Sequence, residues 1–288
     1  MNQSLRWQLK KTARKSFALG HRLFHPSMSR ARAKNEAVRV LTYHRFGEVD
    51  HDAFCVAPKD FERQMAWLAE NDLAVSLQDV DQYIHYGKSL RDGAVLVTMD
   101  DGCLSVLTHA LPILKHYGIP SVAFVTTGNV EVKQDQLNQQ GEKPKEDYLD
   151  WEQLGRLSAA GVDIGSHAVT HRSLARIPVN EAEKEMYESR EELEKKLGIS
   201  VSSFAYPYGT LADFNSAIAD GLRNAGYRVA FTSQHGILRR DIDPMLLPRI
   251  KVEGGDAEWL FPMLARGGLD NWRWIDKALW RMQASGRG

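Results

Sequence analysis

Cysteine is scarce in this chain of 288 residues, which contains only Cys55 and Cys103. Two thiols are too few for a disulfide framework, and we expect both to be unpaired, as in a reducing compartment. The chain also lacks an apolar run of 18 or more residues, and its first residues contain no compact apolar stretch that ends in small residues. These absences predict a cytoplasmic protein that neither spans a membrane nor begins with a secretory signal.

Net charge is absent overall, because 37 Lys and Arg balance 37 Asp and Glu. The two signs are nevertheless unevenly distributed along the chain. Nine Lys or Arg precede the first acidic residue, Glu36, which leaves 28 basic against 37 acidic residues in the rest of the chain. A net negative body does not attract a polyanion, so we expect no nucleic-acid partner.

The apolar content of 43% is sufficient for one large core, and we predict a single domain at residues 37–255 between two tails. Residues 1–36 form a basic amphipathic segment, in which aromatic residues and leucines are mixed with cations. Such a segment could lie on an anionic membrane surface, where each cation contributes about 1 kcal/mol. We therefore expect peripheral contact at the inner face of the membrane. A partly ordered, solvated tail is the alternative.

The C-terminal tail, residues 256–288, holds four of the seven tryptophans and several cations. We expect a helical appendage that covers the end of the domain. Tryptophan and arginine are also enriched at membrane interfaces and in protein interfaces, which are the two alternatives.

Short runs of β-forming residues alternate with helical patterns between residues 38 and 252. Residues 38–43 are the first expected strand, and Phe61, Met65 and Leu68 then recur at the spacing of one helix face. Such alternation predicts an α/β fold with parallel strands and right-handed connections. Residues 129–150 interrupt the pattern with polar sequence. They predict a surface insertion, which is either a substrate loop or a disordered excursion.

The strand expected at residues 95–99 ends in Asp100, Asp101 and Gly102. Strand ends of this kind are where α/β folds place their chemistry. Because side chains alternate along a strand, the two carboxylates should point in different directions, so that one could bind a metal while the other transfers a proton. Helix capping is the alternative.

His167 and His171 are four residues apart, and if this segment is helical they share one side of it. Two imidazoles and a carboxylate leave positions open on a bound zinc ion, as catalytic zinc sites require, and Asp101 is the natural third ligand. Alternatively, both histidines are rim or capping residues. The same three groups also form the facial triad of iron(II) oxygenases, although that assignment explains neither Asp100 nor the later Tyr-Pro-Tyr turn.

Three segments carry a resemblance to a known family: residues 98–102 (Thr-Met-Asp-Asp-Gly), 165–171 (Gly-Ser-His-Ala-Val-Thr-His) and 204–209 (Phe-Ala-Tyr-Pro-Tyr-Gly). In this order they resemble the motifs of the polysaccharide deacetylases, the NodB-homology family of carbohydrate esterases. The resemblance covers about residues 38–252. It implies a distorted (β/α) barrel of about seven parallel strands. The implied activity is metal-dependent hydrolysis of N-acetyl groups on amino sugars of a polysaccharide, an oligosaccharide or a lipid-linked saccharide.

The resemblance also implies roles for individual residues. Asp101, His167 and His171 would bind a divalent metal, which we expect to be zinc. Asp100 would be the general base, and the backbone N–H of Tyr208 would help to hold the oxyanion of the tetrahedral intermediate. We expect the two residues before Tyr208, Tyr206 and Pro207, to contact the saccharide substrate.

Two departures from the family pattern affect the expected acid. Ala205 stands where many members carry an arginine that orients the catalytic aspartate. Arg249 ends a Leu-Pro-Arg segment where many carry Leu-x-His, with the histidine as general acid. We therefore expect His44, which follows the first strand, to be the acid, with His235 as second choice. If no residue replaces the acid, the chain would be a non-catalytic saccharide-binding module.

Overall fold

The computed structural model describes residues 7–8, 11–17, 19 and 37–274 of the chain. Seven parallel strands form its central sheet, in the order β8-β7-β6-β5-β4-β1-β9. Their bounds are Arg39–Tyr43 (β1), Val95–Met99 (β4), Ser121–Val125 (β5), Val162–Ser166 (β6), Ser203–Ala205 (β7), Val229–Phe231 (β8) and Ile250–Lys251 (β9). Leu247, just before β9, forms a parallel bridge with Phe231 in β8, so the sheet curls round on itself. This confirms the distorted barrel expected from the sequence.

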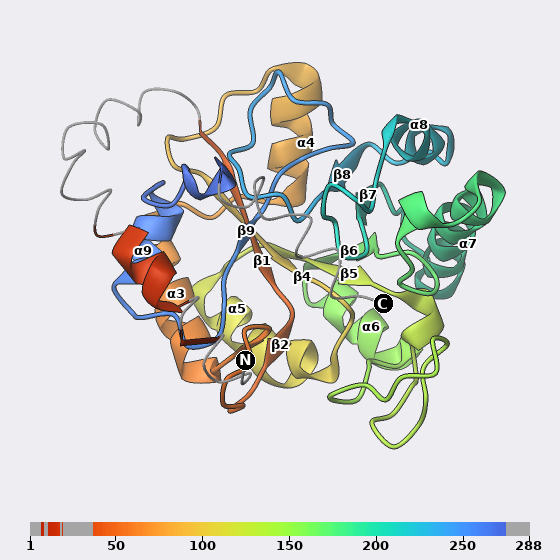
Figure 1. Cartoon of the computed structure of the whole chain (residues 1–288), viewed down its shortest axis with the longest axis horizontal. Coiled ribbons are helices and arrows are strands. Elements are labelled where there is room, and N and C mark those ends of the chain that lie inside the picture. The colour runs from red at the N-terminus through yellow and green to blue at the C-terminus, as the bar shows by residue number, and fades with distance from the viewer. Residues whose placement is uncertain (1–6, 9–10, 18, 20–36, 275–288) are drawn as a thin grey trace.

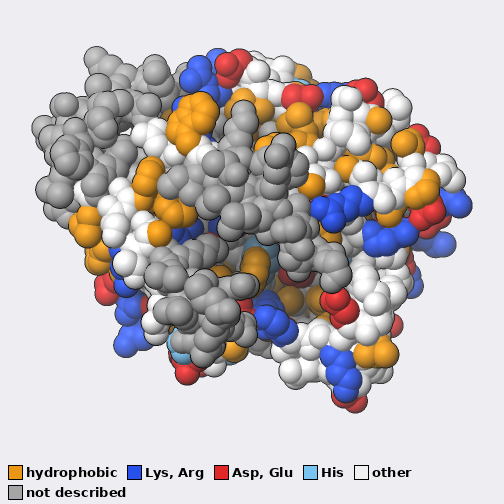
Figure 2. Space-filling view, in the orientation of Figure 1, with side chains coloured by type: hydrophobic (Ala, Val, Ile, Leu, Met, Phe, Trp, Pro, Cys, Tyr) orange, Lys and Arg blue, Asp and Glu red, His pale blue; other side chains and the backbone are white. Residues whose placement is uncertain are grey.

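Helices surround the curled sheet (Figure 1). They are Pro58–Glu70 (α3), Leu77–Tyr86 (α4), Leu111–Tyr117 (α5), Trp151–Ala159 (α6), Val179–Leu197 (α7), Ser216–Asn224 (α8) and Leu260–Ala265 (α9). The predicted apolar face of α3 is buried, with Phe61, Met65 and Leu68 at its centre. Figure 2 shows Lys and Arg side chains gathered at the edge of the molecule where α7 lies, as its charged sequence predicts.

The buried side chains form two layers because strand residues alternate between the faces of the sheet. Leu41 and Val97, which are paired in register, pack toward α3 and the other outer helices. Val40 and Leu96, the preceding pair, pack with Phe124 on the inner side. Both faces of the strands are therefore apolar, which explains why the strands read as nearly continuous hydrophobic runs.

The segment before α4 makes one isolated parallel bridge, from Ala74 to Val95. The polar insertion is ordered rather than a disordered excursion, because its last residues are hydrogen-bonded to the turn that follows Asp101. The N–H of Leu104 donates to Asp147 O at 2.8 Å, and the N–H of Leu149 donates to Gly102 O at 2.9 Å. The insertion therefore lies beside the strand end that carries the paired carboxylates.

The described part of the C-terminal tail packs against the barrel. The ring of Phe261 in α9 lies 5.8 Å from Trp67 in α3, and Leu264 is buried. Asp270 accepts two hydrogen bonds from the buried guanidinium of Arg39, at 3.2 and 2.8 Å. Residues 275–288, including Trp280, lie outside the described residues.

The described part of the N-terminal segment also packs against the domain. Residues 11–17 are helical, and the cations of Lys11 and Arg14 are buried against the turn after β9. Lys11 Nζ lies 3.1 Å from Glu253 and 2.8 Å from Asp256, and Arg14 lies 3.0 Å from the same Asp256 carboxylate. Two of the nine early cations are thus neutralised by the domain itself. Residues 20–36 lie outside the described part.

No helix in the described part of the chain combines the length and the apolar composition that a membrane crossing requires. Both cysteines are free and buried, which confirms the expectation of two unpaired thiols.

Candidate metal centre and active site

The paired carboxylates follow β4 at the end of the sheet where the neighbouring strands β5 and β6 also end. Asp101 has φ 76° and Gly102 has φ 77°, so the chain turns sharply after the strand. Asp100 is 2% exposed, whereas the side chain of Asp101 is 26% exposed. One carboxylate is therefore buried and the other faces the rim.

Asp101, His167 and His171 come together at this rim, as predicted. The Nε2 atoms of His167 and His171 each lie 3.5 Å from Asp101 Oδ1, and the three donor atoms all lie within 4.8 Å of one another. One carboxylate oxygen and two imidazole nitrogens are a ligand set that suits zinc and leaves a position open for water or substrate. The donor set therefore fits a divalent metal.

The tautomer of His167 also fits a ligand role. Its Nδ1 lies 2.7 Å from the carbonyl oxygen of Ala205. A carbonyl oxygen only accepts, so Nδ1 carries the proton and Nε2 presents its lone pair toward Asp101. Burial lowers the pKa of His167 to about 4, although the charges of Asp100 and Asp101 oppose this shift. The imidazole is therefore neutral at pH 7, the form that binds metals.

His171 reaches the centre through a turn rather than along a helix, which corrects the helical spacing expected from the sequence. Ala168 has φ 64° and His171 has φ 58°, both in the left-handed region. The two imidazole rings nevertheless lie 4.9 Å apart between centroids. With Asp101 and Tyr208, these residues account for four of the seven positive-φ non-glycine residues in the described part. Each such residue costs about 1–3 kcal/mol, and strain of this kind is concentrated at functional sites.

Asp100 is held by Arg249, a contact that the sequence did not predict. The Arg249 side chain is fully buried, and its Nη1 and Nη2 each donate to one oxygen of Asp100 at 2.7 Å. Its Nε donates to the carbonyl oxygen of Thr232 at 2.9 Å, which fixes the plane of the guanidinium. The arginine that the family pattern places at position 205 is thus replaced by one that directly precedes β9, two strands from β4 in the sheet.

Arg249 also determines the charge of Asp100. Burial is the largest single influence and raises the pKa of the Asp100 carboxyl. The charge and hydrogen bonds of Arg249, together with the charges of His167 and His44, outweigh burial, and the pKa falls to about 2. Asp100 is therefore a carboxylate at any neutral pH.

The turn after β7 brings Tyr208 to the centre. Tyr208 has φ 60° and Gly209 has φ 61°, and a Cβ at Gly209 would lie 2.5 Å from the backbone nitrogen of Ser233. The ring of Tyr208 packs against the ring of His171, with centroids 4.7 Å apart, and is 39% exposed. Pro207 is buried, and its carbonyl oxygen accepts from the N–H of Gly209 at 2.6 Å.

Tyr206 does not contact the centre, contrary to expectation. Its side chain is fully buried and packs against the rings of Phe204 and Phe214. Its hydroxyl donates to Met245 O at 2.9 Å. Tyr206 is therefore a core residue, because strand alternation turns it to the outer layer of the sheet, where a saccharide cannot reach it.

The two candidate acids lie on different segments. His44 follows β1 directly and is half-buried, with its ring 4.8 Å from that of Phe54. It is close enough to Asp100 to lower the pKa of that carboxyl. His235 is buried in the segment between β8 and β9, next to Gln234, whose carbonyl oxygen accepts from the N–H of Arg249 at 3.0 Å.

Asp213 is a second buried residue that the sequence did not single out. It accepts from the hydroxyl of Ser173 at 2.7 Å and from the N–H of Thr210 at 2.9 Å. These bonds join the turn after His171 to the turn after Tyr208. No sequence spacing marks Asp213. The sequence did hold a signal for Arg249, because it has alanine at position 205, where the family pattern has arginine, and arginine at position 249, where the pattern has histidine.

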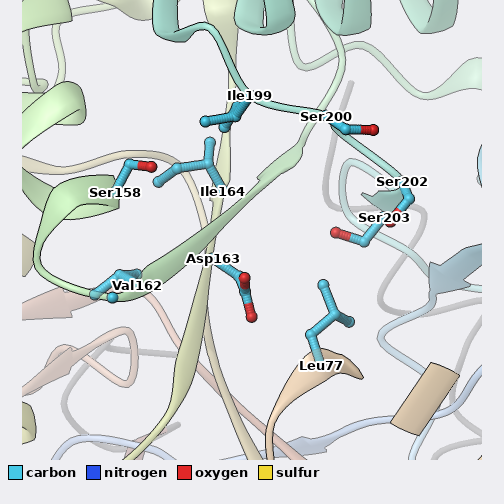
Figure 3. Close-up of a pocket in the computed structure, with 10 residues that line it drawn as sticks. Leu77, Ser158, Val162, Asp163, Ile164, Ile199, Ser200, Ser202 and Ser203 are labelled. Atoms are coloured by element: carbon cyan, nitrogen blue, oxygen red, sulfur yellow. The ribbon is translucent and has the colours of Figure 1, made fainter. Parts of the chain in front are cut away.

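A cavity of about 190 Å³ lies elsewhere, at the start of β6 and therefore at the opposite end of the barrel. Figure 3 shows the side chains of Asp163 and Ser203 pointing into it, with Leu77 on another side. None of the predicted site residues lines this cavity.

Comparison with known proteins points to the part of the chain that carries Asp101, His167 and His171. A family model described as polysaccharide deacetylase matches residues 87–230, which is half of the chain. A poly-β-1,6-N-acetyl-D-glucosamine N-deacetylase of Staphylococcus epidermidis is 25% identical over 252 residues, which cover 79% of this chain and 82% of that protein.

Two solved structures of other proteins have a fold similar to that of this chain. IcaB from Ammonifex degensii has a TM-score of 0.67 and 26% identity, and the match covers 81% of this chain and 97% of that one. The deacetylase PplD of Streptococcus pyogenes, solved in complex with acetate, has a TM-score of 0.69 and 21% identity, and the match covers 79% and 98% of the two chains.

Proposed function

This chain belongs to the polysaccharide deacetylase family, and we propose that its candidate centre hydrolyses the N-acetyl groups of an N-acetylglucosamine chain. The observation that carries the proposal is the pairing of two sites: a rim donor set of Asp101, His167 and His171, and a buried carboxylate of Asp100 held by Arg249. The names of the relatives, one a poly-β-1,6-N-acetyl-D-glucosamine N-deacetylase, support the choice of sugar.

Asp101, His167 and His171 would hold the divalent cation, which we propose to be zinc. When bound in such a site, zinc polarises a carbonyl oxygen and lowers the pKa of a water toward about 7. The protein supplies neutral imidazoles and one carboxylate, so the donors need no large rearrangement to bind it.

Asp100 acts as the general base. Its oxygens each accept one hydrogen bond from Arg249 and retain a further lone pair, with which one of them can take the proton of the attacking water. A carboxylate with a pKa near 2 is a weak base toward ordinary water. Asp100 can therefore deprotonate only a water whose pKa is already lowered, so its role as a base depends on the metal that Asp101, His167 and His171 would hold.

His44 acts as the general acid. The departing sugar nitrogen must gain a proton, because an amine anion is a very poor leaving group. Arg249 is committed to Asp100 and stays protonated, so it cannot supply this proton. His44 follows β1 directly, is close enough to Asp100 to lower the pKa of that carboxyl, and has a half-buried ring.

Tyr208 supplies the oxyanion contact through its backbone N–H. Its left-handed conformation sets the direction of that N–H, and the preceding proline limits the freedom of the turn. The partly exposed ring of Tyr208 is placed to contact the sugar beside His171.

Acetate release from β-1,6-linked N-acetylglucosamine oligomers tests the function. Wild-type protein loaded with zinc should release acetate and form one free amine per acetate. Replacement of each donor, by Asp101→Ala, His167→Ala and His171→Ala, should weaken metal binding and stop the release. Saccharide binding without acetate would favour a non-catalytic module, and oxygen uptake with iron(II) would favour an oxygenase.

We further propose that the chain is cytoplasmic and touches the inner face of the membrane through its N-terminal segment. The nine early cations and the two unpaired cysteines support this. Lys11 and Arg14 are committed to ion pairs, so the other cations would make the contact. Exchange of Arg30, Arg32 and Lys34 for serine should reduce flotation with anionic vesicles, whereas unchanged flotation would contradict the proposal.

A further inference from the structure

Glu185 is a buried carboxylate that the proposed chemistry does not use. It lies in the middle of α7, on the outside of the barrel, yet it is 3% exposed and points toward the segment between His167 and His171. A buried charge without compensating contacts is unfavourable, so its partners indicate why it is present.

Among the described residues, Glu185 forms its hydrogen bonds with Val169, Thr170 and Arg172. Oε2 accepts from the N–H groups of Val169 and Thr170, at 2.9 and 2.8 Å. Oε1 accepts from the hydroxyl of Thr170 and from Nη2 of Arg172 at 3.1 Å. Glu185 therefore holds two of the three peptide N–H groups that lie between the two histidines, and the third, that of Ala168, donates to Ser166 Oγ.

The conformation of the segment explains why it needs such a partner. Ala168 and His171 have φ values of 64° and 58°, which L-residues adopt rarely. The turn directs the N–H groups of residues 169 and 170 away from the barrel and toward α7. On the other side, the N–H of Gly128 donates to Val169 O at 2.8 Å. The segment is thus held between the barrel and Glu185.

We propose that Glu185 is a positioning residue that preorganises the turn carrying His171 for metal binding. It does not touch the metal or the substrate, and the proposal rests on the proposed function of the Asp101, His167 and His171 donor set. Because His171 follows Thr170 directly, loss of the Glu185 contacts would let the imidazole leave its position next to Asp101. Supporting groups behind metal ligands commonly contribute roughly 10- to 100-fold to metal affinity.

The test compares two glutamates on the same helix. Glu181 also accepts from Arg172, at 2.9 Å, but its side chain is 42% exposed. Glu185→Gln keeps the shape of the side chain but presents an amide NH₂ to groups that are themselves donors. Glu181→Gln makes the same chemical change and removes the same charge, four residues away, so it is the matched control.

The first readout is the dissociation constant for zinc, measured on the full-length protein by competition with a chromophoric chelator. Glu185→Gln should raise this constant by roughly 10- to 100-fold, and Glu181→Gln should leave it within about 2-fold of wild type. The visible absorption of the cobalt-loaded protein should also change in Glu185→Gln alone, because it reports ligand geometry. Wild-type affinity and spectrum in Glu185→Gln would overturn the proposal, as would an equal loss in both variants.

A second variant decides the question if Glu185→Gln does not fold. Thr170→Val keeps the size of the side chain and removes only the hydroxyl that donates to Glu185. It should fold normally and raise the zinc dissociation constant by about 3- to 10-fold, whereas unchanged affinity would reject the positioning role. Wild-type protein that binds no zinc would instead contradict the proposed function itself.

Discussion

Two buried ion-pair clusters flank β9, and they differ in what they hold. Arg249, just before the strand, holds the carboxylate of Asp100 from inside the barrel. Glu253, just after the strand, and nearby Asp256 hold Lys11 and Arg14, cations from the N-terminal segment. The first cluster joins two barrel strands, whereas the second attaches a distant segment to the barrel.

The difference teaches how buried charge is used in this fold. Taking charged groups out of water is expensive, and an ion pair recovers that expense only with good geometry and further hydrogen bonds. The Arg249 cluster has that geometry and keeps Asp100 ionised for chemistry. The N-terminal cluster spreads its contacts over four charged groups and creates no reactive group. We therefore expect the first cluster to control both turnover and stability, and the second to control stability alone.

Asp100→Asn is the change with the largest expected effect. It keeps the shape of the side chain but removes the basic oxygen, so turnover should fall roughly 10²- to 10⁴-fold while zinc binding is retained. Measurement of kcat together with zinc content checks this. Asp163→Asn, which alters a carboxylate at the other end of the barrel, is the control and should keep wild-type turnover. Near-normal turnover in Asp100→Asn would place the base elsewhere.

Arg249→Met should destabilise the protein by about 3–5 kcal/mol, because it leaves a buried carboxylate without its partner. Urea denaturation measures this, and Arg39→Met is the matched control, because Arg39 makes a similar buried pair with Asp270 away from the centre. Both variants should lose stability, but only Arg249→Met should also lose turnover in the fraction that remains folded. Equal turnover in the two folded variants would mean that the Arg249 pair matters no more for the chemistry than a buried pair away from the centre.

Arg14→Met should destabilise the protein by about 2 kcal/mol, less than Arg249→Met, because Lys11 remains to pair with Glu253 and Asp256. Hydrolysis of a small soluble substrate should stay within about 3-fold of wild type, since this cluster holds no reacting group. Denaturation and kcat are measured on the same preparation. A loss of turnover as large as that of Asp100→Asn would show that the N-terminal segment takes part in the chemistry.

Arg239→Ala should have the smallest effect. Arg239 and Asp241 form an exposed pair at 3.2 Å, with side chains 67% and 72% exposed. Pairs of this kind contribute less than about 1 kcal/mol because water screens them. Thermal unfolding should therefore change little, and the result sets the baseline against which the two buried clusters are compared. A change as large as that of Arg14→Met would mean that burial is not what separates these pairs.

Much of the fold was predictable from short-range sequence patterns. The strand at residues 95–99 and the helix face of Phe61, Met65 and Leu68 follow from local periodicity, which the structure keeps. The order of the three motifs indicated which side chains meet, because the ends of parallel strands share one edge of a sheet. Asp101, His167 and His171 therefore come together as expected.

Other features depended on contacts that local patterns do not encode. Strand alternation places Tyr206 on the same face as Phe204, but only packing against the helices decides that this face is the core. The sequence likewise did not indicate that His171 arrives through a left-handed turn, because that turn depends on neighbouring segments. The spacing of four residues correctly predicted that His167 and His171 lie close together, but it did so by assuming a helix that the segment does not form. A period of four residues describes a helix, whereas this turn is held by Glu185 from another element.

The partner of Asp100 was decided only by the tertiary structure. Asp100 and Arg249 are 149 residues apart, and no motif links them. They meet because β9 pairs with β1, the neighbour of β4, and because the bridge between Leu247 and Phe231 closes the curled sheet around them. The sequence by itself determined the strands, the carboxylate pair and the two histidines, since these depend on local periodicity and on strand direction. Which cation would neutralise the buried carboxylate depended on the closure of the barrel, because an ion pair forms wherever folding brings opposite charges together out of water.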